Sequence, residues 1–212
     1  MDSTVPDPLP MEAIPAGTSL LVAGPSLTRK RELMLRFVSP GTDSKGGAVV
    51  TTKKGAGTIL QRLDIPPGEA HRRHLKIVDC VTKQRGMGDV RETATTKYIS
   101  SPQDLTGLSI KLSGVFKELY EQDVETHVGL DSLSTFLMYH DLQRVYRVLH
   151  VLTGQIETAG WLGAFVIDSP TDRELEVLTQ LVDGMIQTRE TDSGYELRLR
   201  GIEGVSSQWT SY

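Results

Sequence analysis

The chain has 212 residues and a single cysteine, Cys80. One cysteine excludes an internal disulfide and any metal site built only from cysteines, and it agrees with a reducing compartment. No apolar run approaches the roughly eighteen residues that indicate a membrane-spanning helix. The first residues are acidic and proline-rich, whereas a signal peptide begins basic and continues apolar. These absences predict a soluble, cytoplasmic protein with no membrane segment.

Excess positive charge is also missing. The chain has 23 Lys and Arg against 27 Asp and Glu, a formal net charge of −4. It therefore has no overall attraction for nucleic acid or acidic membranes. Basic residues interleaved with aromatic ones, which favour binding of single strands, are absent as well. We expect neither nucleic acid nor membrane as a partner.

The composition is that of a globular protein, with 38% hydrophobic and 24% charged residues. The proline-rich start predicts a flexible tail over residues 1–12. The length of the remainder suits one domain with a well-buried core, which we expect to span residues 13–212.

Strand-like and helix-like segments alternate along most of this domain. Apolar or β-branched runs predict strands at 19–23, 48–52, 75–81, 97–100, 126–133 and 163–167. Helical patterns fall at 28–37, 57–63, 105–121, 141–158 and 172–181. The glycine-rich segment 38–47 and the polar segment 82–96 are expected to be loops. This alternation predicts an α/β fold with a mostly parallel sheet between two helical layers. A closing hairpin, 184–189 and 195–200, should add antiparallel strands at one edge.

A phosphate-binding loop is predicted after the first strand. The strand at 19–23 runs into a turn at Gly24 and then a helix, an order that presents backbone N–H groups to phosphate. The full motif is G-x-x-x-x-G-K-[ST]; Gly24 and Lys30 match it, whereas Arg29 and Arg31 replace the second glycine and the hydroxyl residue. The candidate nucleotide- or phosphate-binding residues are Gly24, Thr28, Arg29, Lys30 and Arg31.

Four further segments complete a pattern that resembles one protein family. They are Ile14-Pro15-Ala16-Gly17, Leu130-Asp131-Ser132-Leu133, Phe165-Val166-Ile167-Asp168-Ser169, and Val182-Asp183-Gly184-Met185-Ile186 with Arg198-Leu199-Arg200-Gly201. In order and spacing, the chain resembles the KaiC/GvpD-like branch of the RecA-type P-loop ATPase superfamily, especially its haloarchaeal regulatory proteins. The resemblance implies a RecA-like three-layer α/β/α fold. It also implies that Asp131 holds Mg²⁺ through water, and that Arg198 and Arg200 reach the phosphates of a neighbouring subunit.

The chain departs from this family at positions that catalysis requires. The family's water-activating glutamate follows the second strand, where this chain has Lys53 and Lys54. A protonated lysine cannot act as the base, and Arg31 carries the same sign of charge as the metal. We therefore assign no catalytic residue. We expect a regulatory or signalling domain that binds a nucleotide, with ATP and Mg²⁺ as the candidate ligands, and hydrolyses it little or not at all. Its expected partners are further copies of itself or a regulatory protein.

Two alternatives remain open. The chain could be a protein-interaction scaffold that kept the fold and lost the ligand, since arginines flank Lys30. It could also be an active ATPase if Glu69 or Asp79 served as the base. The histidines at 71, 74, 127, 140 and 150 lack the spacing of a metal site, and Cys80 ends an apolar strand, so we expect neither to be functional.

Overall fold

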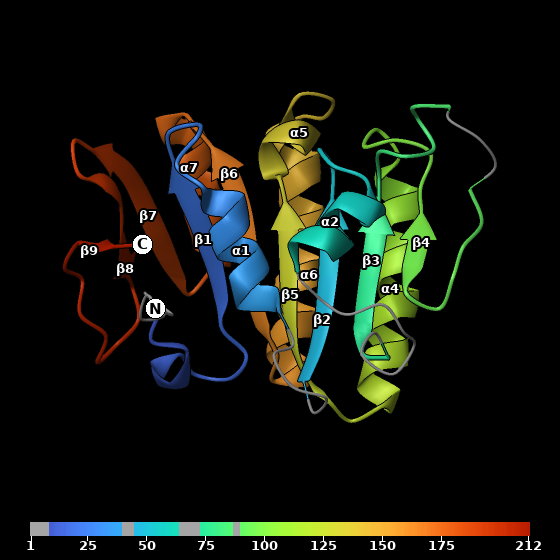
Figure 1. The fold of residues 1–212 in the computed structure, drawn as a ribbon, viewed down its shortest axis with the longest axis horizontal. Helices are drawn as coiled ribbons and strands as arrows, with labels where there is room; N and C mark the ends of the chain where they lie inside the picture. The colour runs from blue at the N-terminus through green and yellow to red at the C-terminus, as the bar shows by residue number, and fades with distance from the viewer. Residues whose placement is uncertain (1–8, 40–44, 64–72, 87–89) are drawn as a thin grey trace, which may run out of the picture.

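The computed structural model describes residues 9–39, 45–63, 73–86 and 90–212. Over these residues the strands form one nine-stranded sheet in the order β4-β3-β2-β5-β6-β1-β7-β8-β9 (Figure 1). The strands are β1 Ser19–Gly24, β2 Lys45–Thr51, β3 Leu75–Asp79, β4 Thr96–Tyr98, β5 Glu125–Asp131, β6 Leu162–Asp168, β7 Gly184–Thr191, β8 Gly194–Arg200 and β9 Thr210–Ser211. Neighbours from β4 to β7 pair in parallel, whereas β8 and β9 are antiparallel. The predicted mostly parallel sheet with antiparallel strands at one edge is confirmed.

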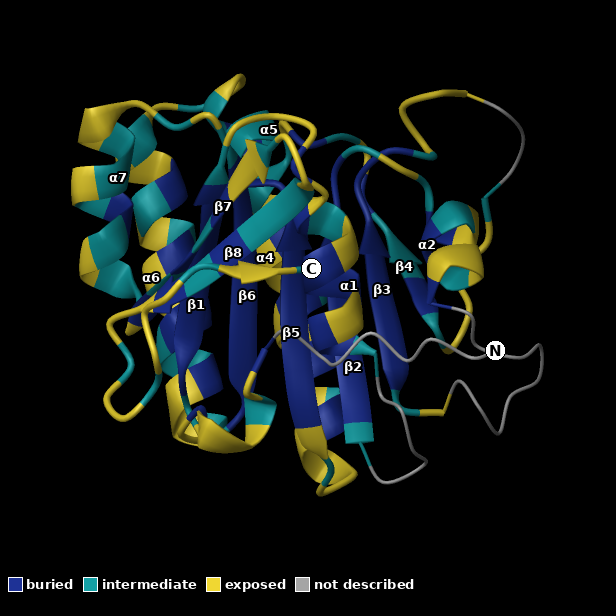
Figure 2. Cartoon of the chain, turned by 60° about the vertical axis from the view of Figure 1, so that its left-hand side comes forward, coloured by how far each residue is buried: buried dark blue, intermediate teal, exposed yellow. Residues whose placement is uncertain are grey.

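Helices cover both faces of the sheet (Figure 1). They are α1 Lys30–Val38, α2 Ala56–Arg62, α4 Leu105–Glu121, α5 Leu133–Leu137, α6 Leu142–Ala159 and α7 Asp172–Leu178, with short 3-10 turns at Met11–Ala13 and Thr179–Leu181. One face carries α1 and α2, and the other carries α4, α6 and α7. The central strands are buried on both faces, as parallel strands between two helical layers must be (Figure 2). No described helix is long and apolar enough to cross a membrane.

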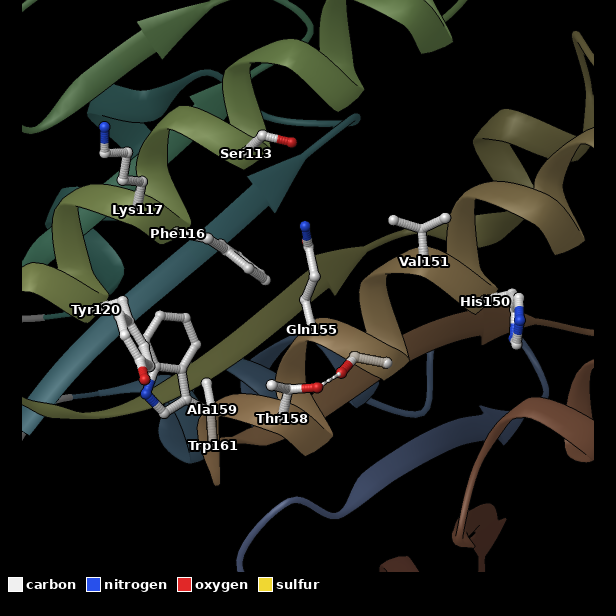
Figure 3. Close-up of a pocket in the computed structure, with 11 residues that line it drawn as sticks. Ser113, Phe116, Lys117, Tyr120, His150, Val151, Gln155, Thr158, Ala159 and Trp161 are labelled. Carbon is white, nitrogen blue, oxygen red and sulfur yellow. Dashed lines mark hydrogen bonds between the residues drawn. The ribbon is translucent and has the colours of Figure 1, made fainter.

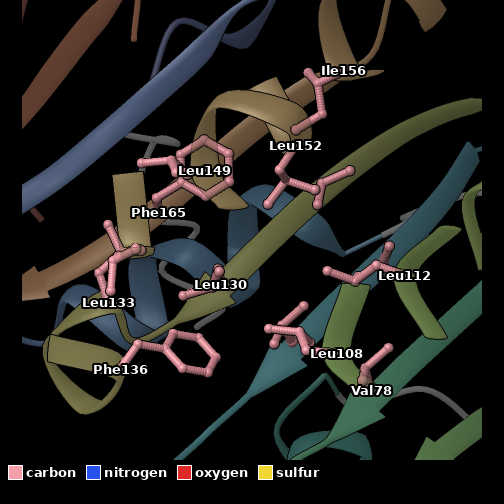
Figure 4. Close-up of a cluster of buried hydrophobic side chains, with 14 of the residues drawn as sticks. Val78, Leu108, Leu112, Leu130, Leu133, Phe136, Leu149, Leu152, Ile156 and Phe165 are labelled. Carbon is pink, nitrogen blue, oxygen red and sulfur yellow. The ribbon is translucent and has the colours of Figure 1, made fainter. Parts of the chain in front are cut away.

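The two long helices begin where their sequence predicts. Asp104 caps α4 by accepting from the Gly107 N–H at 2.7 Å, and Asp141 caps α6 by accepting from the Arg144 N–H at 2.8 Å. Leucines and other apolar residues at steps of three and four turn toward the sheet, where they meet β3, β5 and β6 (Figure 4). Each fully buried leucine contributes about 1.5–3 kcal/mol. This packing fixes the strands whose ends form the site.

Three features differ from the sequence predictions. Gly46 and Gly47 lie in β2 and not in a loop, since both pair with β5. Glycine fits this strand because a Cβ on Gly47 would come within 2.8 Å of the Val38 carbonyl oxygen. The helix α5 and the strand β9 were not predicted; both are too short to show a period. The strand β7 is the first strand of the predicted hairpin, yet it pairs in parallel with β1.

Parts of two predicted loops and of the tail lie outside the described residues, namely 1–8, 40–44 and 87–89. Of the predicted tail, Leu9 is 4% exposed and belongs to the buried apolar cluster that includes α1. Residues Met11–Ala13 form the first 3-10 turn.

Candidate functional site

The candidate site lies where four parallel strands end side by side. In the sheet register Gly24 of β1 faces Asp168 of β6, and Thr51 of β2 faces Asp131 of β5. The loop after β1 and the helix α5 rise from this edge of the sheet (Figure 1). Side chains far apart in the sequence therefore converge on the start of α1, the position at which open α/β sheets bind ligands.

The loop between β1 and α1 adopts a tight conformation. Leu27 and Arg29 have positive φ values of 69° and 53°, so Arg29 takes the left-handed conformation for which the motif uses glycine. Gly24 is required by space, because a Cβ there would come within 2.3 Å of the Thr188 hydroxyl. The buried Thr28 hydroxyl donates to the Pro25 carbonyl oxygen at 2.9 Å.

The backbone N–H groups in the first turn of α1 have no acceptor within the helix. Arg29 provides no side-chain cap, and the first helical bond runs from the Leu33 N–H to the Arg29 carbonyl oxygen at 3.1 Å. The N–H groups before Leu33 thus point out of the helix with no intrahelical partner. Such groups, together with the helix dipole, favour an anion.

Lys30 is buried and held by the loop that it follows. Its side chain is 2% exposed, its ammonium group donates to the Gly24 carbonyl oxygen at 3.0 Å and to the Pro25 carbonyl oxygen, and it lies 2.9 Å from Asp168 Oδ1. Burial lowers the pKa of Lys30, against the opposing effect of Asp168. Lys30 is thus held between the carbonyl oxygens of its own loop and the carboxylate of Asp168.

Asp168 binds two lysines at once. Its Oδ1 pairs with Lys30 and its Oδ2 with Lys53. Burial alone would raise the pKa of Asp168, but the hydrogen bonds and charges of Lys53 and Lys30 outweigh it, and the pKa lies below its ordinary value. A carboxylate in this state stays ionised and occupies the cations that a phosphate would otherwise meet.

Arg31 pairs with the predicted metal ligand. Its Nε donates to Oδ2 of Asp131, whose side chain is 1% exposed. The other carboxylate oxygen of Asp131 is buried and has no hydrogen-bond partner among the described residues. Mg²⁺ needs oxygen ligands in octahedral geometry, yet here the guanidinium of Arg31 occupies one carboxylate oxygen of Asp131 and brings a positive charge to it. The residues present do not fit Mg²⁺.

The lysines that stand where the family's glutamate is expected differ in their contacts. Lys53 pairs with Asp168, whereas Lys54 is exposed and its carbonyl oxygen accepts from the Thr51 hydroxyl. Of the two carboxylates considered as a base, only Asp79 is among the described residues. Asp79 is buried and accepts four hydrogen bonds, from the N–H groups of Ala56, Val81 and Thr82 and from the Thr82 hydroxyl. Asp79 therefore joins β3 to the start of α2. Glu69 lies outside the described residues.

A cavity of about 320 Å³ connects these groups. Five cationic and three anionic side chains line it, an excess of two positive charges in a chain whose net charge is −4. They are Arg29, Lys30, Arg31, Lys53 and Arg62 against Glu32, Asp131 and Asp168. Four of the five predicted phosphate-binding residues are therefore close together, since Thr28 also lines the cavity, and Gly24 shapes the loop behind it.

The predicted trans-acting arginines contact their own chain. Arg198 donates to the Gln187 side-chain oxygen at 2.7 Å, and its guanidinium lies 4.5 Å from the centre of the Trp209 ring. Arg200 is exposed and faces Met185, two residues further from the carboxyl edge of the sheet. That either arginine reaches a neighbouring subunit stays a prediction.

The histidines and the cysteine show no site of their own. His127 Nδ1 lies 2.7 Å from the Phe37 carbonyl oxygen, and His74 Nδ1 lies 2.6 Å from the Gln122 side chain. Cys80 is fully buried, and burial raises the pKa of its thiol. His71 lies outside the described residues.

Sequence reasoning missed the residues that close the loop from the far end of the chain. Asp168 is not among the residues that the sequence predicts for the site, yet it pairs with both Lys30 and Lys53. The Tyr212 hydroxyl donates to the Thr28 carbonyl oxygen, and the Thr188 hydroxyl lies 2.7 Å from that of Thr28. The position of Asp168 at the end of a strand was the one signal available.

Comparison with known proteins agrees with this architecture. The KaiC-like protein PH0186 from the hyperthermophilic archaeon Pyrococcus horikoshii matches with a TM-score of 0.62 and 15% sequence identity, over 95% of this chain and 89% of that one. The chain therefore has a KaiC-like, RecA-type fold. It belongs to the family described as Family of unknown function (DUF7504), whose model matches residues 17–188. No curated protein matches it.

Proposed function

We propose that this chain is a regulatory RecA-like domain that binds a nucleotide or another phosphate-bearing anion at the 24–31 loop and hydrolyses it little or not at all. The observation that carries the proposal is the cavity with five cationic and three anionic side chains at the start of α1. Charge-assisted hydrogen bonds to phosphate are among the stronger ones in proteins.

The same cavity disfavours hydrolysis. Phosphoryl transfer needs a metal at the phosphates and a group that orients or deprotonates water. Arg31 pairs with the predicted metal ligand Asp131 and so disfavours a metal there. Lys53, which pairs with Asp168, occupies the position where the family's glutamate is expected. Binding without turnover is the behaviour that these side chains support, and a conformational or assembly signal is its natural output.

The test is a titration with a fluorescent ATP analogue, alongside a phosphate-release assay. We expect saturable binding, at least about tenfold weaker in Lys30→Ala, and no phosphate release above the buffer rate. Arg36→Ala, on the exposed side of the same helix, removes an equal charge and should bind normally. Binding that Lys30→Ala leaves unchanged would contradict the proposal, and phosphate release lost in Asp131→Ala would favour an active ATPase.

A second candidate function is a protein-interaction scaffold, which a groove between α4 and α6 favours. Two adjoining cavities of about 640 and 290 Å³ share Ser113, Val151 and Gln155. Figure 3 shows the ring of Phe116 and the side chain of Gln155 pointing into the space between the helices. Val151 is 60% exposed beside this space. A groove that runs along two helices suits a partner helix.

The charges of the groove select the partner. Its lining includes Lys117 and Arg147 and no carboxylate. We infer an amphipathic partner helix with acidic residues beside its apolar face. A designed peptide with leucines at helical spacing and glutamates elsewhere should bind, and its lysine counterpart should not. Val151→Glu should abolish binding, whereas Ile110→Glu, equally exposed but outside the groove, should not. Equal binding of both peptides, or of neither, would exclude this partner.

Self-association is part of the proposal through Arg198 and Arg200. It predicts a concentration-dependent rise in mass by light scattering. A monomer at every concentration would contradict self-association, and the two arginines would then serve only the contacts within their own chain.

A further inference from the structure

The position of Arg31 gives the anion site a further property. Arg31 is the second residue of α1 and lines the cavity, and its side chain is 22% exposed. Only its Nε is engaged, on Asp131; within the described residues the guanidinium makes no other hydrogen bond. An arginine has five N–H donors in a fixed planar arrangement, so the four N–H groups on its two terminal nitrogens remain available.

The carboxylate of Asp131 fixes how Arg31 is oriented. Asp131 is fully buried at the end of β5, whose register with β2 and β6 holds it in place. The pair leaves the terminal nitrogens of Arg31, a residue of the first turn of α1, as a positively charged group of the cavity lining. In a metal-dependent nucleotide site this is the place of a divalent cation anchored on a strand-end carboxylate.

We propose that Arg31 takes over the role of the divalent cation, so that the site binds the phosphates of its ligand without Mg²⁺. The inference rests on the proposed function, because it specifies the form in which the ligand is bound. Arg31 remains paired with Asp131 through Nε and donates from its terminal nitrogens to a phosphate oxygen. Lys30 and Lys53 supply the remaining charge once the ligand displaces Asp168 from them.

The experiment compares binding of ATP and of inorganic pyrophosphate in excess EDTA and in saturating Mg²⁺, measured by calorimetry on the full chain. We expect affinities in EDTA that equal or exceed those in Mg²⁺, since Mg²⁺ neutralises ligand charge. Affinity at least about tenfold higher in Mg²⁺ would overturn the inference and leave the proposed function standing. No binding in either buffer would refute the proposed function itself.

Two variants test the residues. Arg31→Thr restores the hydroxyl of the motif and frees Asp131; it should lose binding in EDTA and regain it in Mg²⁺, with a Mn²⁺ resonance signal that the wild type lacks. Asp131→Asn keeps a polar partner for Arg31 and should still bind in EDTA, whereas in a metal-dependent site it would abolish binding. Arg36→Thr is the charge-matched control. Loss of EDTA binding in Asp131→Asn, with the fold intact by circular dichroism, would overturn the inference even if Arg31→Thr fails to fold.

Discussion

Replacing Asp168 with asparagine should make the protein less stable and its anion site stronger. Asp168 is the shared partner of Lys30 and Lys53, and the Lys30 side chain is 2% exposed. Removing one partner of a fully buried ion pair costs about 3–5 kcal/mol. Here the cost is lower, because Asp168 is 22% exposed and Lys30 keeps its contacts to the Gly24 and Pro25 carbonyl oxygens.

The remaining loss is close to that of one charged hydrogen bond, about 2 kcal/mol. For a chain of this length it corresponds to a fall in Tm of about 4–8 °C. Urea unfolding at neutral pH and low salt measures the free energy. Asp192→Asn, at the exposed turn of the β7–β8 hairpin, changes the net charge equally and should leave stability within about 0.5 kcal/mol of the wild type.

Ligand binding should change in the opposite direction. In the wild type a phosphate must displace the Asp168 carboxylate, whereas in Asp168→Asn both lysines are free to bind it. We expect pyrophosphate to bind about tenfold more tightly to the variant, a gain of about 1.4 kcal/mol, and to restore part of the lost Tm. A variant as stable as the wild type that binds pyrophosphate no more tightly would refute the reasoning, because Asp168 would then not be the internal anion of the site.

Three other outcomes follow from the described contacts. The stability that Asp168 contributes should be fully present above its ordinary pKa of 3.8 and lost as pH falls through its lower folded pKa. When the free energy of unfolding is measured across acid pH, Asp168→Asn should not show this loss. Gly24→Ala should cost at least about 2 kcal/mol in urea unfolding, because its Cβ would meet the Thr188 hydroxyl and carbonyl oxygens at 2.3 and 2.5 Å; a cost below that of Gly57→Ala, whose Cβ meets open space, would show that the loop can shift. Cys80 should resist a thiol reagent in the folded protein and react on unfolding, since its thiol is buried and its pKa raised; labelling of the folded chain would contradict that burial.

The sequence was a good guide to elements with a long period and a poor one to contacts between distant segments. The helices α4 and α6 were predictable because their apolar residues repeat over four or more turns behind an aspartate cap. The loop after β1 was predictable because Gly24 and Lys30 keep the spacing of a known motif. The parallel pairing of β7 with β1 was not, because local turn chemistry indicates a hairpin and carries no information on which strand its first arm joins.

The same limit applies to the site. The departures at Arg31 and Lys53 were visible in the sequence, but their partners were not. Asp168 meets Lys53, 115 positions away along the chain, only because β2 and β6 lie on either side of β5 in the sheet. Spacing rules describe neighbours along one helix or strand, whereas these pairs depend on the order of strands in the sheet.

The substitutions in the site form one consistent set when they are taken with those partners. Arg31 brings a positive charge to the position where the family resemblance predicts the metal, and Lys53 brings one to the position where it predicts the base. A carboxylate of the same chain pairs with each of them. Under the proposed function, ligand binding is an exchange of anions in which phosphate replaces Asp168. Asp168 precedes Ser169, whose N–H donates to the Gly24 carbonyl oxygen at 2.9 Å and whose hydroxyl accepts from the Ser26 N–H. Release of Asp168 would therefore disturb both the 24–31 loop and the segment leading into α7. Such a change would let a site without turnover signal that it is occupied.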